Sequence, residues 1–304
     1  MPPDSARWTI LDVMQWAAKY FTSHDVESPR LSSELLLAHV LGLNRLDLYL
    51  DYDRPLEADE LAALRALIKR RAGGEPVAYI VGEKDFREAS FEVCRHVLIP
   101  RPDTETLVEC ALDALDGLTG HNLSGTGETT VWEPATGSGA VVLSLAARLP
   151  QVRFVASDIS PAALEVARRN AARQGLLDRV NFFAADWTVG LRPGRAVFDM
   201  IVANPPYVST GELPQLARDI RDYEPAIALD GGKDGLTQVR RLVYSAADFL
   251  SPRGLLLLEI GWDQKEAVAG LARETGSYAT VDFVRDLAGH DRVALLRRKS
   301  APTS

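Results

Sequence analysis

Two apolar segments constrain the fold of this chain more than any other feature of its sequence. Residues 198–203 and 254–260 each contain four consecutive apolar residues without polar alternation. A strand of that kind is covered on both faces, as in a parallel sheet flanked by helices. From residue 130 onward, strand patterns alternate with helical ones. The alternation predicts a doubly wound α/β sheet with an antiparallel edge at its end. The predicted strands are 130–132, 153–157, 180–184, 198–203, 254–260, 280–284 and 292–296, and the predicted helices are 138–149, 161–174, 236–250 and 263–275.

The first 73 residues follow a different pattern, in which apolar residues recur at helical spacing and no strand pattern is present. Thr9 and Asn44 are suitable N-caps, and Gly42 and Gly73 are suitable helix stops. This part of the chain is therefore predicted to form a small helical bundle with its own core. Its predicted helices are 9–21, 32–41, 44–50 and 57–71.

Between these two regions, residues 78–82 and 90–93 are predicted to be the strands of a hairpin, with a turn at 83–88. A helix is predicted at 105–115 and a loop rich in Gly, Ser and Thr at 118–129. The predicted domains are a helical bundle at 1–75, a β-hairpin linker at 76–100 and an α/β domain at 101–300.

The composition limits the possible partners. The net charge of −8 argues against a broad nucleic-acid footprint, which needs an excess of Lys and Arg. Two cysteines provide neither a disulfide framework nor a metal site, and they fit a reducing cytosol. No signal peptide and no apolar run of membrane-spanning length is present in the sequence. We therefore expect a cytoplasmic monomer with no stable nucleic-acid or membrane partner.

The segment Asn204-Pro205-Pro206-Tyr207 directly follows the predicted strand 198–203. Two prolines hold this segment extended just past the carboxyl end of the strand, where open α/β sheets bind ligands. It presents an amide side chain, backbone carbonyls and an aromatic ring together. The alternative interpretation is a rigid turn with a capping Asn.

Three further sites follow the strands that precede this segment. Residues 133–139, which contain Gly137 and Gly139, form either a loop that approaches a ligand or a tight turn between strand and helix. Asp158 can accept hydrogen bonds from ribose hydroxyls, or it can cap the next helix. Asp186 and Trp187 suit an adenine, although a Trp in such a place can also be simple packing. Together these sites describe a cofactor that carries a nucleoside, with its reactive end at Asn204.

The arrangement resembles the Rossmann-like S-adenosylmethionine-dependent methyltransferases that act on planar nitrogens. Three more stretches, residues 99–105, 224–236 and 258–261, are similar to those of the HemK/PrmC family, including its Pro-Arg-Pro signature at residues 100–102. The resemblance covers nearly the whole chain. It implies a transfer of methyl from S-adenosylmethionine to the side-chain nitrogen N5 of the glutamine in the Gly-Gly-Gln motif of peptide chain release factors. The by-product would be S-adenosylhomocysteine.

The resemblance also implies roles for individual residues. Residues 135–139 would hold the methionine end of the cofactor, Asp158 the ribose, and Asp186 with Trp187 the adenine. The chain departs from the family at residues 133–135, where Glu-Pro-Ala replaces the usual Asp-Leu-Gly, and a β-carbon at Ala135 narrows the room for the methionine moiety. The expected cofactor contacts are Glu133, Ala135, Thr136, Gly137, Ser138, Gly139, Asp158, Asp186, Trp187 and Asn204.

The expected catalytic residues are Asn204, Pro205, Pro206 and Tyr207. The Asn204 side-chain oxygen and the Pro205 carbonyl would accept the two N–H bonds of the target amide, and Tyr207 would cover its plane. Two other classes of function stay open at this point. One is methylation of adenine or guanine in nucleic acid, or of a ribosomal-protein glutamine. The other is a cofactor-binding regulatory protein without activity.

Overall fold

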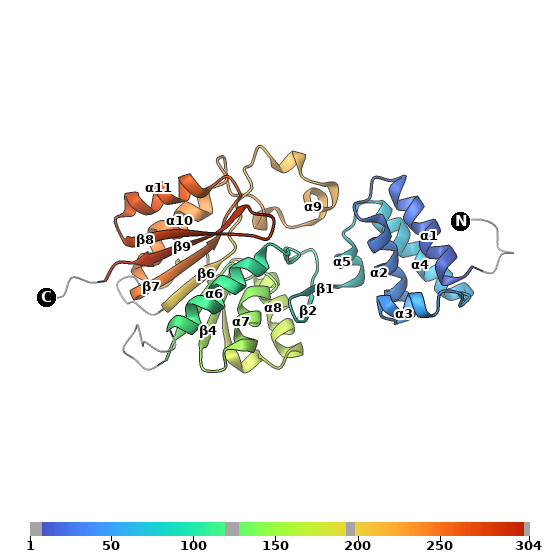
Figure 1. Ribbon diagram of the computed structural model, residues 1–304, viewed down its shortest axis with the longest axis horizontal. Coiled ribbons are helices and arrows are strands. Elements are labelled where there is room, and N and C mark those ends of the chain that lie inside the picture. Colours follow the sequence, from blue (N-terminus) through green and yellow to red (C-terminus); the bar gives the residue numbers. More distant parts are fainter. Residues whose placement is uncertain (1–7, 119–127, 193–197, 301–304) are drawn as a thin grey trace. The chain divides into compact units, whose positions relative to one another are not determined.

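The chain divides into two compact units in a computed structural model that describes residues 8–118, 128–192 and 198–300 (Figure 1). One unit comprises Met1–Glu83 together with Ala217–Tyr223. The other comprises Lys84–Leu216 together with Glu224–Ser304. The first unit therefore contains a segment, Ala217–Tyr223, that is distant in sequence from the rest of it.

The first unit is helical, as predicted. Its helices are α1 (Ile10–Thr22), α2 (Pro29–Leu41), α3 (Arg45–Leu50), α4 (Ala58–Ala72) and α5 (Val77–Val81). Thr9 caps α1 through a reciprocal capping box with Asp12, and Gly42 ends α2 in the left-handed conformation. Phe21, Leu36 and Leu64 are buried in a core whose described members all lie between Trp8 and Val81.

A sixth helix, α9 (Arg218–Tyr223), joins this unit from far along the chain. Arg71 of α4 is 4% exposed, and its guanidinium pairs with Asp219 at 3.3 Å. The Tyr223 hydroxyl donates to the Gly73 carbonyl at 3.3 Å. The sequence does not predict α9, because six mostly charged residues carry no helical periodicity.

The predicted strand at 78–82 is wrong, since these residues form most of α5. The Pro76 carbonyl accepts hydrogen bonds from the Tyr79 and Ile80 N–H groups, and Gly82 ends the turn at φ +85°. The hairpin lies further along, in β1 (Glu83–Phe86) and β2 (Ala89–Glu92). The second strand is confirmed to within one residue, whereas β1 occupies residues that were expected to form the turn. Apolar residues drove the strand prediction, but five residues are too few to separate the two periodicities.

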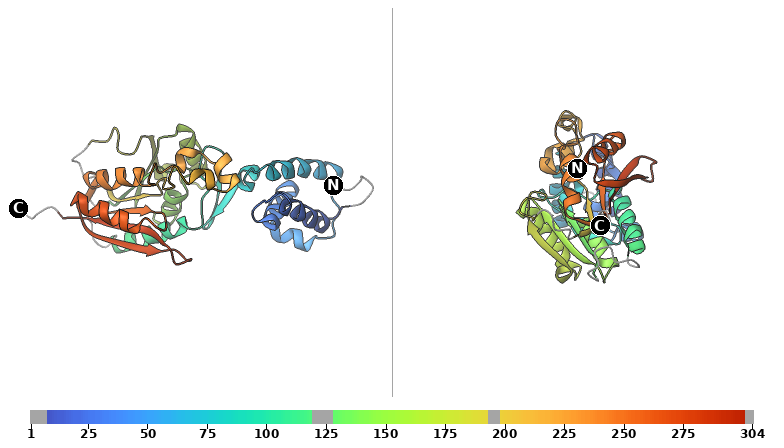
Figure 2. Two further views of the ribbon diagram at one scale, coloured as in Figure 1. Left: turned by 90° about the horizontal axis from the view of Figure 1, so that it is seen from above. Right: turned by 90° about the vertical axis from the view of Figure 1, so that its left-hand side faces the viewer.

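The second unit contains the predicted sheet, and the α/β fold with its antiparallel edge is confirmed (Figures 1 and 2). The strand order is β5-β4-β3-β6-β7-β9-β8. The first five of these strands are parallel, while β9 runs antiparallel to both β7 and β8, which are drawn in orange to red. The strands are β3 (Thr130–Pro134), β4 (Arg153–Asp158), β5 (Val180–Ala184), β6 (Phe198–Ala203), β7 (Leu250–Glu259), β8 (Tyr278–Arg285) and β9 (Asp291–Arg298).

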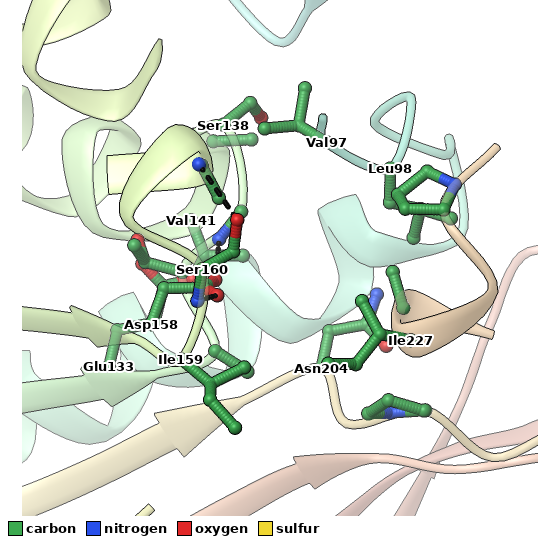
Figure 3. A pocket seen from close by; sticks show the side chains of 18 of the residues that line it. Val97, Leu98, Glu133, Ser138, Val141, Asp158, Ile159, Ser160, Asn204 and Ile227 are labelled. Carbon is green, nitrogen blue, oxygen red and sulfur yellow. Dashed lines mark hydrogen bonds between the residues drawn. The ribbon is translucent and has the colours of Figure 1, made fainter. Parts of the chain in front are cut away.

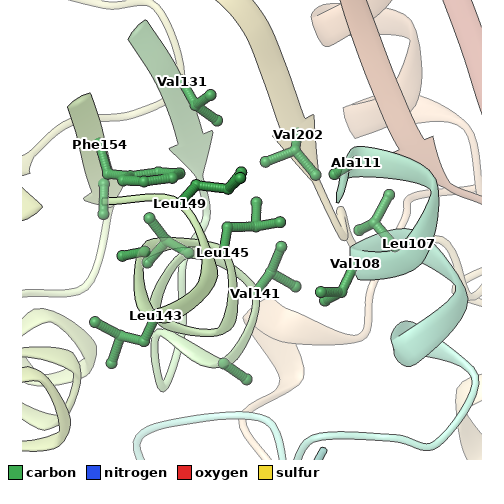
Figure 4. Close-up of a cluster of buried hydrophobic side chains, with 14 of the residues drawn as sticks. Leu107, Val108, Ala111, Val131, Val141, Leu143, Leu145, Leu149, Phe154 and Val202 are labelled. Atoms are coloured by element: carbon green, nitrogen blue, oxygen red, sulfur yellow. The ribbon is translucent and has the colours of Figure 1, made fainter. Parts of the chain in front are cut away.

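Helices cover both faces of this sheet, and they are α6 (Thr104–Leu118), α7 (Ala140–Arg148), α8 (Pro161–Arg173), α10 (Thr237–Ser245) and α11 (Lys265–Thr275). On β6, Met200 and Val202 pack with α6 and α7, whereas Ile201 and Ala203 pack with α10 and α11. Figure 4 shows Val202 facing Leu107 and Val108 of α6. Every residue of β6 is buried, which explains the absence of polar alternation there. Most of the loop predicted at 118–129 falls on 119–127, outside the described residues.

Asn170 of α8 ties the hairpin to the loop after β3. This side chain is fully buried, and its Oδ1 accepts from the Glu92 N–H at 2.7 Å. Its Nδ2 donates to the Glu92 carbonyl at 3.1 Å and to the Ser138 carbonyl at 2.9 Å. One amide thus satisfies three backbone groups from two segments.

Replacing this amide should destabilise the sheet unit. In Asn170→Ala, three hydrogen bonds are lost and buried backbone groups are left unpaired, so we expect a loss of about 3 kcal/mol in the free energy of unfolding. Urea denaturation followed by circular dichroism measures the change. Asn181→Ala, at an exposed position of β5, should change the free energy by less than about 0.5 kcal/mol. Equal effects of the two substitutions would contradict the anchoring role.

Candidate active site

A cavity lies at the carboxyl ends of β3, β4, β5 and β6, where the strand order reverses direction (Figure 3). Asp158 and Ser160 lie on one side of it, and Leu98 and Ile227 lie on the other. Such a switch point is the usual ligand site of an open α/β sheet. Its described lining includes ten of the expected site residues: Glu133, Ala135, Thr136, Gly137, Ser138, Asp158, Asp186, Trp187, Asn204 and Pro206.

Glu133 organises the loop between β3 and α7. Its side chain is 2% exposed, and its Oε2 accepts from the Thr136 hydroxyl at 2.5 Å and from the Val142 N–H at 3.1 Å. Val142 is in the first turn of α7, where backbone N–H groups have no partner within the helix. Glu133 therefore caps this helix. Burial raises the pKa of its carboxyl to about 8.

Three residues of the same loop have positive φ angles: Ala135 at +55°, Gly137 at +55° and Gly139 at +82°. Gly139 is not among the residues that line the cavity. A β-carbon there would lie 3.1 Å from Leu143 and 3.4 Å from Ala167, so the glycine serves the packing of α7 against α8. Ala135 therefore has a left-handed backbone conformation, which residues other than glycine rarely adopt.

Asp158 ends β4 and connects two loops. Its Oδ2 accepts from the Gly137 N–H at 2.9 Å, and its Oδ1 accepts from the Ser160 N–H at 2.9 Å. Burial is the main cause that raises the pKa of this carboxyl. Each oxygen keeps a lone pair, so the carboxylate can still accept hydrogen bonds from hydroxyl groups in the cavity.

Asp186 and Trp187 both reach the cavity, and α10 supplies a partner for each. Asp186 pairs with Arg241 at 2.9 Å, and the Trp187 indole N–H donates to the Gln238 Oε1 at 2.8 Å. Both partners also line the cavity. A ligand that donates to Asp186 must therefore share this carboxylate with a guanidinium.

The segment after β6 divides between two hollows. Asn204 and Pro206 line the cavity, Tyr207 lines a second hollow together with Trp262, and Pro205 is in neither lining. The Asn204 Nδ2 donates to the Thr104 hydroxyl at 3.2 Å, and the Tyr207 hydroxyl donates to the Glu259 Oε1 at 3.2 Å. This place for the Tyr207 ring differs from the expected one over a target amide.

A glycine-rich loop, residues 231–235, contacts the backbone at Tyr207 and Val208, where this segment ends. The Gln264 side chain donates to the Tyr207 carbonyl at 3.0 Å and to the Gly235 carbonyl at 3.2 Å. The Gly231 N–H donates to the Val208 carbonyl at 2.7 Å. A β-carbon at Gly235 would lie 2.5 Å from the Tyr207 carbonyl oxygen. The glycines at 231–235 thus allow two backbones to approach closely.

An ion pair joins the stretch at 99–105 to the stretch at 224–236. Arg101 contacts the Glu224 carboxylate, which is 6% exposed, and the same carboxylate accepts from the Ile99 N–H at 3.1 Å. Pro225 and Ile227, next along the chain, form a wall of the cavity. Among the described residues, no group of three or more His, Cys, Asp or Glu side chains could hold a metal ion. The described helices include none that is long and apolar enough to cross a membrane.

Comparisons with known proteins identify the family of this chain. Residues 12–82 match the family model of the PrmC N-terminal domain, and residues 131–223 match that of a methyltransferase domain. The chain is 42% identical over 291 residues to the release factor glutamine methyltransferase of Moorella thermoacetica, covering 96% of this chain and 99% of that relative. The protein of that name from Geobacter sulfurreducens is 41% identical over 286 residues, with 94% and 95% covered.

The chain belongs to the release factor glutamine methyltransferase family. The resemblance predicted from its sequence motifs is thereby confirmed. Among solved structures, the hMettl16 catalytic domain in complex with MAT2A 3′UTR hairpin 1 has a TM-score of 0.54 at 14% identity, with 83% of this chain and 85% of that chain covered. At that identity the likeness concerns the methyltransferase fold alone.

Several residues that hold the site of this family member were not predicted from the sequence. Gln238 and Arg241 lie on an ordinary amphipathic helix, and only their contacts in space connect them with Asp186 and Trp187. Thr104 and Glu259 appeared only as letters within longer motifs. Their position in those motifs was the one signal that could have identified them.

Ala135→Gly should stabilise the protein. The left-handed conformation at position 135 is unfavourable for alanine but not for glycine. This benefit should exceed the backbone entropy that glycine loses on folding, so we expect the free energy of unfolding to rise by about 0.5 to 1 kcal/mol. Urea denaturation provides the measurement. Ala172→Gly, at an exposed position of α8, should instead destabilise by about 1 kcal/mol. A loss in both variants would show that position 135 is not strained.

Glu133→Gln should change the pH dependence of stability. Burial raises the pKa of this carboxyl from 4.5 to about 8 in the folded protein. The unfolded chain therefore loses the proton first, and wild-type stability falls as the pH rises between these two values. Glutamine does not titrate, and its Oε1 can accept the same two hydrogen bonds. The stability of the variant relative to wild type should therefore rise between pH 5 and pH 9, as measured by urea midpoints. Glu266→Gln, at an exposed position of α11, is the control, and the same trend there would exclude burial as the cause.

Proposed function

We propose that this chain methylates the side-chain nitrogen N5 of the glutamine in the Gly-Gly-Gln motif of peptide chain release factors. The methyl donor is S-adenosylmethionine and the by-product is S-adenosylhomocysteine. The observation that carries the proposal is the place of Asn204, whose amide faces a cavity with nucleoside-binding features in a chain of this family. The reaction belongs to translation termination and takes place in the cytoplasm, with the enzyme acting as a monomer.

The cofactor site follows from the hydrogen-bonding capacity of the lining. Asp158 accepts from the ribose hydroxyls, because both of its oxygens keep an unused lone pair beside their backbone bonds. Asp186 and Trp187 would hold the adenine, and Asp186 is also paired with Arg241. Residues 135–139 hold the methionine end, where the Ala135 β-carbon and the apolar wall at Val97 and Leu98 limit the space. The residues present fit the group.

Asn204 orients the nucleophile. An amide nitrogen is a poor nucleophile because its lone pair is delocalised into the carbonyl, so alignment matters more than a strong base. When bound, S-adenosylmethionine supplies an electrophilic methyl group on a sulfonium. The Asn204 Nδ2 is already occupied by Thr104, which leaves the Asn204 Oδ1 to accept one N–H of the target amide. The Pro205 carbonyl accepts the other, and the amide proton leaves to water after transfer.

The two prolines and Tyr207 keep these acceptors in place. Pro206 fixes its own φ and restricts Pro205, so the carbonyl direction changes little. Tyr207 is held by Glu259 at its hydroxyl and by Gln264 at its carbonyl. We assign the helical domain, residues 1–75, to recognition of the protein substrate, since it has its own core and none of its described residues is in the cavity lining.

The direct test is mass spectrometry of a release factor after incubation with the enzyme and S-adenosylmethionine. We expect one added methyl group on the glutamine of the Gly-Gly-Gln motif and none on a release factor that carries alanine there. Parallel reactions contain DNA, RNA and ribosomal protein. Methyl transfer to any of these, with none to the release factor, would overturn the assignment.

Asn204→Ala should lose methyl transfer while cofactor binding survives. Without the Oδ1 acceptor, the target amide is no longer aligned, and we expect kcat to fall by about 100-fold or more. Radiolabelled methyl incorporation measures the rate, and calorimetry with S-adenosylmethionine measures binding. Asn181→Ala, on the exposed side of β5, is the matched control. Normal turnover in Asn204→Ala would refute this mechanism.

A further inference from the structure

A buried carboxyl lies directly behind the Asn204–Tyr207 segment. Glu259 ends β7, the neighbour of β6, and is 1% exposed. Its Oε1 accepts from the Tyr207 hydroxyl, whereas its Oε2 has no hydrogen-bond partner among the described residues. A buried carboxylate oxygen without a donor is unfavourable, so a group close to it should be able to supply one.

Thr104 is the group that can supply this donor. It begins α6, is 4% exposed, and already accepts from the Asn204 Nδ2 at 3.2 Å. A hydroxyl that accepts one hydrogen bond still has its own proton to donate. The Glu259 carboxyl is close to that proton, because Thr104 is bonded to Asn204, and Ala203 before Asn204 pairs in the sheet with Leu258 before Glu259. The Thr104 hydroxyl also lowers the pKa of this carboxyl, against the larger effect of burial.

We propose that Glu259 and Thr104 are positioning residues that fix which end of the Asn204 amide faces the target glutamine. Glu259 accepts the Thr104 proton, and Thr104 accepts an N–H from the Asn204 Nδ2. The Asn204 Oδ1 is then directed to the cavity as an acceptor. This inference rests on the proposed function, since it concerns how the same amide meets a target that presents N–H groups.

Without this relay, the Asn204 amide has no fixed direction. The oxygen and nitrogen ends of an Asn side chain have nearly the same shape, so only hydrogen bonds distinguish them. The turned amide would present N–H groups to the N–H groups of the target. Alignment of the nucleophile would be lost, although the cavity would keep its shape.

The charges around Glu259 decide in which pH range the relay operates. Burial raises the pKa of Glu259 to about 7, against the opposing effects of Thr104, Arg292 and Tyr207, while Asp103 adds to the rise. Arg292 of β9 is itself paired with Asp286 at 3.0 Å and with Asp103 at 3.1 Å. The ionised carboxyl only accepts hydrogen bonds, whereas the protonated carboxyl can also donate one. The protonated form then competes with the Asn204 amide for the Thr104 hydroxyl as an acceptor. The rate should therefore rise with pH through about 7.

The first experiment compares substitutions at Thr104. Thr104→Val keeps the shape and removes the hydroxyl, and we expect kcat to fall by about 10- to 100-fold with S-adenosylmethionine affinity unchanged. Thr104→Ser keeps the hydroxyl and should recover most of the rate. Thr106→Val, on the same helix and outside the cavity lining, is the matched control and should turn over normally. Normal kcat in Thr104→Val, or no recovery in Thr104→Ser, would overturn the proposal.

Two further readouts separate positioning from a structural role. If Thr104 acts through Asn204, then Thr104→Val should cause little further loss of kcat in the Asn204→Ala background. Glu259→Gln should lose the rise of kcat near pH 7 that we expect for the wild type. Additive losses in the double variant, or an unchanged pH profile in Glu259→Gln, would each contradict the relay.

The relay can also be tested independently of the substrate. If the wild type does not methylate a release factor, the proposed function fails, and the hydrogen bond is then tested by unfolding. Thr104→Val and Glu259→Gln should have non-additive effects on urea midpoints if their side chains are bonded. Additive effects would overturn the relay, whatever the outcome for the release factor.

Discussion

The site depends on three carboxyl groups that are buried where strands of the parallel sheet end. Glu133, Asp158 and Glu259 lie at the carboxyl ends of β3, β4 and β7. A buried carboxyl needs hydrogen-bond donors. Glu133 takes them from the Thr136 hydroxyl and a helix N–H, Asp158 from loop N–H groups, and Glu259 from a tyrosine hydroxyl. The cavity loops are consequently held by the groups that they satisfy, and a ligand meets acceptors whose directions are already fixed.

The sheet could be predicted from sequence because its strands are buried on both faces. In 198–203 and 254–260 the apolar pattern reports burial directly, and those strands were located to within a few residues. The same reasoning failed at 78–82, where Pro76 and Gly82 close a single helical turn around apolar residues. Helix α9 was not predicted either, because Arg218–Tyr223 is held by the buried Arg71, which lies 147 residues before Arg218. Tertiary contacts of this kind leave no local periodicity.

The candidate site could likewise be predicted only in part from the sequence. Ten expected residues reach the cavity because a strand end fixes their position, which a sequence motif can indicate. Their hydrogen-bond partners could not be predicted, since Thr104 lies 100 residues from Asn204 and Arg241 lies 55 residues from Asp186. Tyr207 illustrates the limit, because the motif placed the residue, whereas Glu259 and Gln264 determine the direction of its ring and carbonyl.

Hydrogen bonds of the neighbouring residues explain how the loop after β3 accommodates the Glu-Pro-Ala sequence at 133–135. The loop is fixed on both sides of the strained Ala135, by Glu133 on α7 and by the Thr136 N–H on the Ser157 carbonyl at 3.0 Å. Asp158 fixes Gly137 one residue later. A left-handed alanine persists when its surroundings determine the backbone so completely. The strain is thus confined to one residue, and the hydrogen bonds on both sides of Ala135 keep the loop in place.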